Sequence, residues 1–417
     1  MYVLYSFLLS LVALFLKVLA RFQPKMRLFV EGRKNTFSLL EEKLPNKPII
    51  WFHAASLGEY EQGLPVMEAI KNKFPDFGIV LTFFSPSGYE VRKNNTIADV
   101  TVYLPLDLNH LVERFLHKTQ PKAAIFIKYE YWPNYLKALK NRNIPTYLVS
   151  GIFRKNQIFF KPFGGFYRKC LSAFHHFFVQ NESSEQLIKS LGFNQVTCSG
   201  DTRFDRVMAI LESNTPLEFV ENFKGNNYLM VIGSSWPKDE QALLSYINDA
   251  PQNLKFIIAP HNIKAEQIQI LQNSIQRNTV LYTEMGGKNL QDFEVMIIDT
   301  VGLLTKIYRY ADWAYVGGGF GNPGVHNVLE PAVFSIPVII GPNYSHFAEA
   351  TDLVNLKGCI SIQNSEELNT LMAKILADAH FRAVIGRINR EYISQKSGAT
   401  NTIMNYLQQS LFTNQSG

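Results

Sequence analysis

The 417-residue sequence contains little cysteine and no pattern of metal ligands. Its three cysteines, Cys170, Cys198 and Cys359, lie far apart and have neither the spacing of a zinc site nor that of a disulfide framework. No Asp-x-Asp pair is placed like a metal site, so we predict no metal and no separate cofactor. Reduced thiols in a cytoplasmic setting are the simplest interpretation.

Repeats, low-complexity tracts and recognisable nucleic-acid-binding modules are also missing from the sequence. Hydrophobic residues make up 47% of the chain and charged residues 18%. This balance is typical of a globular α/β protein and unlike a disordered chain or a polytopic membrane protein. The length exceeds what one hydrophobic core usually supports, so we predict two domains.

Charge is distributed unevenly along the chain. Residues 1–205 carry 26 Lys and Arg against 16 Asp and Glu, whereas residues 206–417 carry 15 against 19. A basic first half suits an anionic surface. Because no nucleic-acid module is recognisable, we predict an anionic lipid surface and no nucleic-acid partner.

Residues 1–16 contain no charged side chain, and the basic residues come after them, beginning with Lys17. A cleaved signal peptide carries its positive charge before its apolar core, so we predict a retained segment. The apolar length reaches about 20 residues only if Lys17 snorkels. The segment therefore either crosses a bilayer or lies in its interface, with the main body on the cytoplasmic side. The alternative is a buried first helix of the globular domain.

Short apolar runs alternate with helical patterns through both halves of the sequence. This alternation predicts two Rossmann-like domains that face each other across a cleft. In open parallel sheets, ligands bind at the carboxyl ends of the strands. Candidate site residues are therefore sought directly after each predicted strand.

The densest cluster of such residues follows a predicted strand over residues 311–316. Gly317–Gly319 let the backbone turn tightly and approach a ligand closely. Asn327 is the predicted N-cap of a helix over residues 328–334. Free N–H groups and the positive end of this helix would converge on an anion, while Glu330 would accept hydrogen bonds from sugar hydroxyls. The alternative is an ordinary strand–loop–helix turn.

A second candidate is Glu59, in the turn between a strand over residues 47–54 and a helix over residues 60–74. A carboxylate at that strand end can take a proton from a substrate hydroxyl. The alternative is a plain helix-capping group. Other polar residues that follow predicted strands are Ser87, Lys128, Glu130, Ser234, Ser235 and His261.

Several separated motifs together carry a resemblance. The second half contains Gly-Gly, then His-Asn-x-Leu-Glu-Pro-Ala, then Pro-Val-x-x-Gly-Pro, and the first half contains His53-Ala54-x-Ser56-x-Gly58-Glu59. The segment Gly200-Asp201-Thr202-Arg203-Phe204-Asp205 adds a third motif near the predicted domain junction. These motifs resemble those of the Kdo (3-deoxy-D-manno-octulosonic acid) transferases. Those enzymes are membrane-associated glycosyltransferases of lipopolysaccharide assembly with the two-domain GT-B fold.

The sequence departs from the family pattern at two places. Glu130-Tyr131-Trp132-Pro133-Asn134 resembles the family's Glu-x-Glu-x-Trp-Pro-Asn, but Lys128 replaces the first Glu. Lys128 would contact an acceptor phosphate or pair with Glu130. Where the family usually has Asn-Ala-Arg, this chain has Ser-Gly-Ile-Phe-Arg, which makes Arg154 a displaced candidate.

The resemblance implies transfer of Kdo from CMP-Kdo to a lipid A precursor of the lipid IVA type at the inner membrane. It implies an inverting reaction with Glu59 as general base. No metal is needed if N–H groups and nearby cations neutralise the departing phosphate. The implied donor-binding residues are Ser234, Ser235, His261, Gly318, Gly319, His326, Asn327 and Glu330. The implied acceptor-binding residues are Ser56, Gly58, Ser87, Lys128, Glu130, Arg154 and Arg203.

The expected organisation has four parts. Residues 1–25 form a membrane anchor, residues 26–210 an acceptor-binding domain, and residues 211–390 a nucleotide-sugar-binding domain. Residues 391–417 form a helix that crosses back onto the first domain. Two alternatives remain open at this point: a GT-B-like nucleotide-sugar epimerase, and a non-catalytic scaffold that binds glycolipid.

Overall fold

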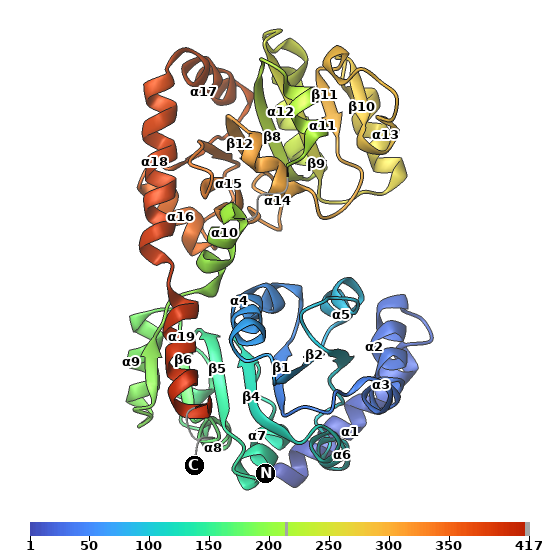
Figure 1. Ribbon diagram of the computed structural model, residues 1–417, viewed down its shortest axis with the longest axis vertical. Helices are drawn as coiled ribbons and strands as arrows, with labels where there is room; N and C mark the ends of the chain where they lie inside the picture. The colour runs from blue at the N-terminus through green and yellow to red at the C-terminus, as the bar shows by residue number, and fades with distance from the viewer. Residues whose placement is uncertain (213–215, 413–417) are drawn as a thin grey trace. The chain divides into compact units, whose positions relative to one another are not determined.

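The computed structural model describes residues 1–212 and 216–412 and forms two compact units (Figure 1). Unit 1 comprises Met1–Arg206 and the chain from Ser397 onward, and unit 2 comprises Val207–Lys396. The division falls inside helix α10 (Thr202–Glu212), where the predicted boundary at residues 210 and 211 also lies. Residues 213–215, near the start of the predicted nucleotide-sugar-binding domain, and the last five residues of the predicted C-terminal segment lie outside the described residues.

Unit 1 contains a seven-stranded sheet in the order β3-β2-β1-β4-β5-β6-β7, and every neighbouring pair is parallel. Its strands are β1 (Ile49–Ala54), β2 (Gly78–Phe83), β3 (Val100–Tyr103), β4 (Pro121–Ile127), β5 (Thr146–Gly151), β6 (His176–Val179) and β7 (Val196–Cys198). Its sheet-covering helices are α4 (Leu57–Lys73), α5 (Pro86–Arg92), α6 (Asn109–Thr119), α7 (Pro133–Asn141), α8 (Gly165–Leu171) and α9 (Glu182–Ser190). The strand order reverses between β1 and β4, which is where a sheet of this kind offers a ligand site.

Helices cover both faces of this sheet, so its central strands are apolar along their whole length. All six residues of β1 are buried. One apolar cluster on the sheet includes side chains of α6, α7, α8 and α9, and the cluster on the opposite face includes side chains of α4. Continuous apolar runs in the sequence therefore correspond here to strands that are buried on both faces.

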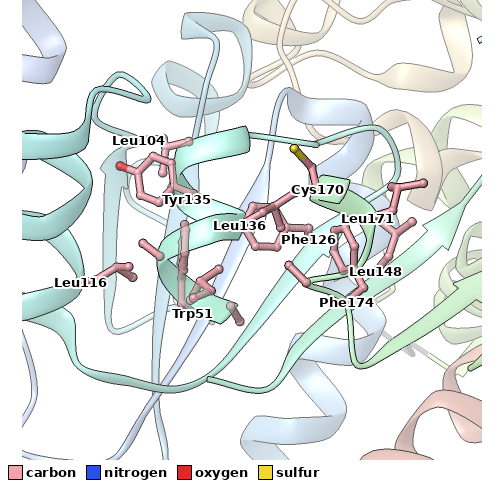
Figure 2. Close-up of a cluster of buried hydrophobic side chains, with 14 of the residues drawn as sticks. Trp51, Leu104, Leu116, Phe126, Tyr135, Leu136, Leu148, Cys170, Leu171 and Phe174 are labelled. Atoms are coloured by element: carbon pink, nitrogen blue, oxygen red, sulfur yellow. The ribbon is translucent and has the colours of Figure 1, made fainter. Parts of the chain in front are cut away.

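Trp51 of β1 lies at the centre of the first cluster (Figure 2). Its ring centroid lies 4.9 Å from that of Phe115, 5.1 Å from Phe126 and 5.4 Å from Tyr135. The indole N–H donates to Thr82 Oγ1 at 2.8 Å, so the polar edge of this fully buried ring is satisfied. The carboxyl end of β1 is thus held in place by a tightly packed core.

Three helices precede the sheet of unit 1: α1 (Tyr2–Leu19), α2 (Pro24–Lys34) and α3 (Thr36–Lys43). Helix α1 has no buried residue, which contradicts the alternative that it is a core helix. One side of α1 contacts the unit, because Tyr2 packs edge-on against Phe166 at 4.9 Å and Ser6 accepts a hydrogen bond from Asn134. The other side is apolar and exposed. The sequence patterns did not predict α2 or α3.

Unit 2 contains a second fully parallel sheet, in the order β10-β11-β9-β8-β12-β13-β14. Its strands are β8 (Tyr228–Ser235), β9 (Leu254–Pro260), β10 (Thr279–Leu281), β11 (Val295–Ile297), β12 (Trp313–Val316), β13 (Val338–Ile340) and β14 (Cys359–Ser361). Its helices are α11 (Glu218–Lys224), α12 (Pro237–Asp249), α13 (Ala265–Ser274), α14 (Leu304–Ile307), α15 (Leu329–Ala332), α16 (Ala348–Asn355), α17 (Ser365–Ala377) and α18 (Ala379–Lys396). Two parallel sheets, each covered on both faces, confirm the predicted pair of Rossmann-like domains.

After α18 the chain returns to unit 1 as helix α19 (Ala399–Leu407). Ile403, Met404 and Leu407 are buried in the same apolar cluster as the side chains of α4. Asp205, near the start of α10, accepts hydrogen bonds from the backbone N–H of Gly398 and of Thr400. The turn that leads into α19 is therefore attached to unit 1 by hydrogen bonds as well as by packing.

Candidate functional site

In unit 1 the predicted base, Glu59, lies in the first turn of α4, directly after β1. Ser56, the residue before this helix, donates its hydroxyl to Glu59 Oε2. Neither side chain bonds the free backbone N–H groups of the helix, so the pair does not form the capping box that a purely structural role would favour. The Glu59 carboxylate is partly exposed at the strand end, where a substrate can reach it.

The turn after β2 lies against the turn after β1. A Cβ on Gly88 would come within 3.0 Å of the Ser56 backbone, so only glycine allows the two turns to approach this closely. In the same turn, Ser87 is exposed and its hydroxyl lies 2.6 Å from that of Ser85. Two of the predicted acceptor-side serines, Ser56 and Ser87, therefore belong to neighbouring turns.

Tyr129, after β4, connects several other predicted residues. Burial raises the pKa of its phenol; the Arg154 guanidinium opposes this rise, Glu59 adds to it, and Arg203 opposes it more weakly. The Arg154 guanidinium carbon lies 5.9 Å from the centre of the Tyr129 ring. A carboxylate and two guanidinium groups thus share one neighbourhood at the carboxyl edge of the unit 1 sheet.

Glu130 is held in a network with the buried imidazole of His53. Glu130 Oε2 accepts from Trp132 Nε1 at 2.7 Å and lies 2.9 Å from His53 Nε2. His53 Nδ1 in turn lies 2.8 Å from Thr82 Oγ1. The Glu130 side chain is only 12% exposed. Its contacts suit a residue that positions the strand end better than one that binds acceptor directly.

In unit 2 the two predicted serines end β8. Ser234 has a positive φ of 53°, an unfavourable conformation for a residue with a side chain. Ser235 is 1% exposed and donates its hydroxyl to Glu240 Oε1 at 2.8 Å. The hydroxyl proton of Ser235 is therefore used within the protein, and phosphate binding by either serine stays a prediction.

The glycine turn after β12 is shaped by close approach of backbones. A Cβ on Gly317 would lie 2.3 Å from the carbonyl oxygen of Ser234. Gly318 has φ of 94°, and a Cβ there would lie 2.2 Å from the carbonyl oxygen of Gly324. Packing between strand ends thus accounts for part of the glycine content that the sequence assigned to ligand binding.

A buried carboxylate, Asp239 of α12, holds this turn in place. Asp239 Oδ2 accepts from the backbone N–H of Gly318 at 2.7 Å and of Trp236 at 2.9 Å. Its Oδ1 accepts from the Tyr315 hydroxyl at 2.8 Å and from the Phe320 N–H at 3.2 Å. The Gly318 amide therefore donates within the protein, and its role in binding phosphate stays a prediction. Asp239 is not among the site residues that the sequence predicted.

Gly319, Gly321 and Gly324 have the Gly-x-Gly-x-x-Gly spacing of a dinucleotide fingerprint. That fingerprint requires a helix to begin within the motif, so that a pyrophosphate meets its N-terminus. Here the next helix, α15, begins at Leu329 and has four residues. The spacing therefore occurs without the structural context that gives it meaning.

Three rings stack where β8, β9 and β12 end. The His261 ring stacks on Trp236 and on His326, with both centroid distances 4.6 Å. Trp236 Nε1 donates to His326 Nε2 at 2.8 Å. Burial lowers the pKa of His261 and of His326, so both rings are neutral near pH 7. With Nε2 acting as acceptor, Nδ1 carries the His326 proton and can donate to a ligand.

Asn327 and Glu330 are linked directly. Asn327 Nδ2 donates to Glu330 Oε1 at 3.1 Å, and Asn327 Oδ1 accepts from the backbone N–H of Leu329 at 3.2 Å. Asn327 therefore bonds the first turn of the helix, but the N-cap is Val328, so the predicted N-cap lies one residue too early. The helix is shorter than the predicted 328–334, so its dipole supplies less positive potential than expected.

Known proteins resemble this chain over most of its length. Residues 17–206 match the family model described as 3-deoxy-D-manno-octulosonic-acid transferase (kdotransferase). The "3-deoxy-D-manno-octulosonic acid transferase" of Aquifex aeolicus is 27% identical over 87% of this chain and 91% of that protein. The protein of the same name from Chlamydophila psittaci is 26% identical over 73% of this chain and 71% of that protein. The chain is therefore similar to Kdo transferases over most of its length.

By this similarity the chain is a glycosyltransferase, as its motifs predicted, and the scaffold alternative is not retained. A solved UDP-N-acetylglucosamine 2-epimerase has a TM-score of 0.58 to it, covering 89% of this chain and 98% of that one. At 11% identity that likeness shows the fold alone and does not favour the epimerase alternative. The predicted GT-B fold class is confirmed.

The two departures from the motifs of the Kdo transferases lie at the same strand-end edge. Lys128 follows β4 with a positive φ of 68°, and its ammonium lies 5.2 Å from the centre of the Tyr129 ring. Arg154 follows β5 and approaches the same ring. Both cations therefore contact Tyr129, a residue that sequence reasoning passed over although it stands between Lys128 and Glu130.

Arg203, the last predicted acceptor-side residue, is paired within the protein. Its guanidinium forms two contacts with Asp201 Oδ2, at 2.9 Å through Nε and 2.8 Å through the terminal nitrogen. Gln62 Nε2 donates to the other Asp201 oxygen at 3.1 Å. The charge of Arg203 is therefore partly balanced by Asp201, which makes Arg154 the more available cation of the two.

Proposed function

We propose that this protein transfers Kdo from CMP-Kdo to a lipid A precursor of the lipid IVA type, with Glu59 as general base and with inversion at the anomeric carbon. The observation that supports the proposal is that Glu59, Arg154 and Arg203 all influence the pKa of Tyr129, with the Arg154 guanidinium carbon 5.9 Å from the centre of its ring. A carboxylate beside cations suits an acceptor that carries both a hydroxyl to be deprotonated and phosphate groups to be bound.

On the acceptor side, Glu59 would take the proton of the attacking hydroxyl. The Ser56 hydroxyl fixes one carboxylate oxygen by its hydrogen bond. Arg154 and Lys128 would meet the acceptor phosphates, because both lie against the Tyr129 ring. Such positioning converts an encounter of two molecules into a reaction of oriented groups.

On the donor side, the departing CMP phosphate needs hydrogen-bond donors. The amide of Gly318 and the hydroxyl of Ser235 are used within the protein, so we assign this role to His326 Nδ1–H, His261 and Ser234. Glu330 would hold the ribose, oriented by Asn327. These neutral donors would stabilise the leaving group without a metal ion.

We also propose that the protein acts at the cytoplasmic face of the inner membrane. In the part of the chain that the structure describes, α1 is the helix long and apolar enough to cross a bilayer, with a mean hydropathy of 2.1 over 18 residues. Both ends of α1 are attached to other elements of unit 1. Tyr2 packs against Phe166, and Arg27 of α2 donates to the carbonyl of Ala20, just after α1 ends. A helix attached along one side suits the membrane interface better than a span.

The test is an assay of CMP release from CMP-Kdo by the full chain, with and without a detergent-dispersed, tetra-acylated lipid A precursor. A Kdo transferase of this acceptor class releases CMP in proportion to Kdo-modified lipid, which mass spectrometry detects. Release without lipid, or transfer to a different acceptor only, would contradict the proposed acceptor. No release under any condition would contradict the donor assignment.

A further inference from the structure

A groove on unit 1 is bordered by α1, α2 and α3 and belongs to neither strand-end site. Its apolar part encloses about 250 Å³ and is lined by Leu16, Val30, Phe37 and Leu111, among others. A second depression of about 600 Å³ shares Lys17, Val30 and Lys34 with the first, so the two are continuous. Together they have the size of a small-molecule site.

The two parts of this groove differ in chemistry. The second depression is rimmed by Lys17, Arg21, Arg27 and Lys34, and its only carboxylate, Glu31, lies 2.6 Å from Lys34. Three cations therefore remain without an acidic partner in that lining. An apolar trough next to a cationic rim fits a molecule with a hydrocarbon chain and an anionic head.

Arg33 adds further positive charge beneath the apolar part. Its guanidinium donates to three backbone carbonyls, those of Leu104 at 2.9 Å, Phe29 at 2.8 Å and Phe84 at 2.6 Å. Within residues 1–212 and 216–412 no carboxylate forms an ion pair with it. Burial lowers the pKa of the guanidinium to about 9, so the group still carries its charge at neutral pH. An anion above it would compensate this charge.

The groove also opens beside the exposed face of α1. Phe7 is 59% exposed, Leu14 62% and Phe15 60%, and Leu16 and Lys17 of the same helix line the groove. A helix that rests with this face in a membrane interface brings the cationic rim to the level of the lipid headgroups. The groove and the apolar face are therefore continuous parts of one lipid-facing surface.

We propose that the groove between α1, α2 and α3 binds a single anionic glycerophospholipid, with one acyl chain against Leu16, Val30 and Phe37 and its phosphate on Lys17 and Arg21. The site goes beyond Kdo transfer, since it requires neither CMP-Kdo nor Glu59. The proposal depends on the proposed membrane association in one respect, because phospholipid must be able to reach α1.

The test uses full-length protein in neutral detergent micelles doped with dioleoyl phosphatidylglycerol, with lipid bound per chain measured by native mass spectrometry. We expect one retained lipid in the parent protein. Val30→Trp, which fills the groove, should abolish retention, and Lys17→Gln with Arg21→Gln should weaken it about tenfold, because each cation near the surface contributes modestly. The charge variants lie on the surface and do not depend on a packed core.

Two matched controls lie on the same helix as Val30. Leu28→Trp and Lys25→Gln change exposed side chains that do not line the groove, and we expect both to retain lipid. Equal loss in Leu28→Trp and Val30→Trp would overturn the proposal, as would equal retention of phosphatidylcholine and phosphatidylglycerol. Displacement of the phospholipid by a lipid A precursor would assign the groove to the acceptor instead. Failure of Kdo transfer alone would leave these lipid measurements unchanged.

Discussion

Glu59 carries the proton transfer in the proposed reaction, and the Ser56 hydroxyl contacts its carboxylate. Glu59→Gln keeps the shape of the side chain but cannot take a proton, so we expect a loss of roughly 10²- to 10⁴-fold in transfer rate. Single-turnover assays with CMP-Kdo and lipid acceptor measure the rate, and calorimetry should show unchanged CMP affinity. Glu61→Gln is the matched control. Glu61 lies on the same helix as Glu59, but its carboxylate pairs with Arg92 and Arg206. Near-normal transfer by folded Glu59→Gln would remove Glu59 from the mechanism.

Asp239 is a positioning residue, since it acts on the ligand through the glycine turn. In Asp239→Asn an amide NH₂ replaces one carboxylate oxygen and faces backbone N–H groups that need an acceptor. Each buried donor left without a partner costs about 1–3 kcal/mol of stability. We expect CMP-Kdo to bind at least about tenfold more weakly, seen as a raised KM with a smaller change in kcat.

The control for Asp239 is Glu240→Gln, which alters the neighbouring carboxylate that Ser235 contacts. Thermal unfolding of both variants separates a local effect from a general loss of stability. A lowered unfolding temperature in Asp239→Asn with unchanged CMP affinity would show that Asp239 stabilises unit 2 without shaping the donor site.

At the residue scale, sequence reasoning located the strand ends but not the partners within them. It selected Gly318 and Ser235 from their types and positions, yet their donors are occupied by Asp239 and Glu240. Which carboxylate reaches which donor depends on side-chain packing between separate strand ends. Sequence spacing holds no record of that packing, and Tyr129 was passed over for the same reason.

Helix α1 is the element whose removal tests the membrane assignment. Deletion of residues 2–20 removes an exposed apolar face but no buried side chain of α1, so we expect a folded protein that no longer sediments with membranes. Arg21 and Arg27 remain, so release should be more complete at high salt. Transfer to a detergent-dispersed acceptor should persist. An insoluble or inactive truncated protein would show that unit 1 needs α1 for folding.

Asp107 interacts with the Tyr5 side chain of α1. Its carboxylate predicts that the stability of the protein depends on pH. This carboxylate is 1% exposed and accepts from the backbone N–H groups of Asn134 and Tyr135, yet burial raises its pKa to about 7. Between about pH 4 and pH 7 the native state holds a proton that the unfolded chain has released. Stability should therefore fall as pH rises through this range, by at most about 1.4 kcal/mol per pH unit.

Asp107→Asn removes this titration, so its denaturant unfolding curves should depend less steeply on pH than those of the parent. The variant should also be less stable overall, because an amide has one acceptor oxygen for the two N–H groups. The difference in slope between the two proteins isolates Asp107 from other titrating groups. Parallel pH profiles would show that Asp107 is ionised in both states across this range.

The elements themselves differ in how well the sequence predicted them. Strands such as β1 stand out because burial on both faces demands an unbroken apolar run. Helix α2 has one buried residue, Phe29, and its half-buried Arg33 sits among carbonyls and rings, so its pattern lacks an apolar face. Helix α15 ends after one turn, and no local signal marked that ending. Helices that depend on tertiary contacts cannot be predicted from the periodicity of apolar residues in the sequence.

At the scale of the whole molecule, the chain crosses twice between the units, because unit 1 is made of two separate segments and unit 2 of one. Unit 1 is completed by residues from Ser397 onward, and α10 contributes to both units. Its last turn is capped from unit 2, where Arg309 donates to the Leu211 carbonyl at 2.8 Å. A fragment ending at Arg206 therefore lacks part of the unit 1 core, whereas the fragment Val207–Lys396 contains its whole unit.

The last prediction follows from this connectivity. Leu407 of α19 is fully buried in the unit 1 core, so Leu407→Ala should cost about 2–5 kcal/mol of stability in unit 1. Hydrogen exchange should speed up in β1, β2 and β4 while amides of β8 and β12 remain as protected as in the parent. Asn405→Ala changes an exposed position on the same helix and serves as the control. Equal acceleration in both sheets would show that the two units unfold together, and no acceleration in β1 would show that α19 contributes little to the core.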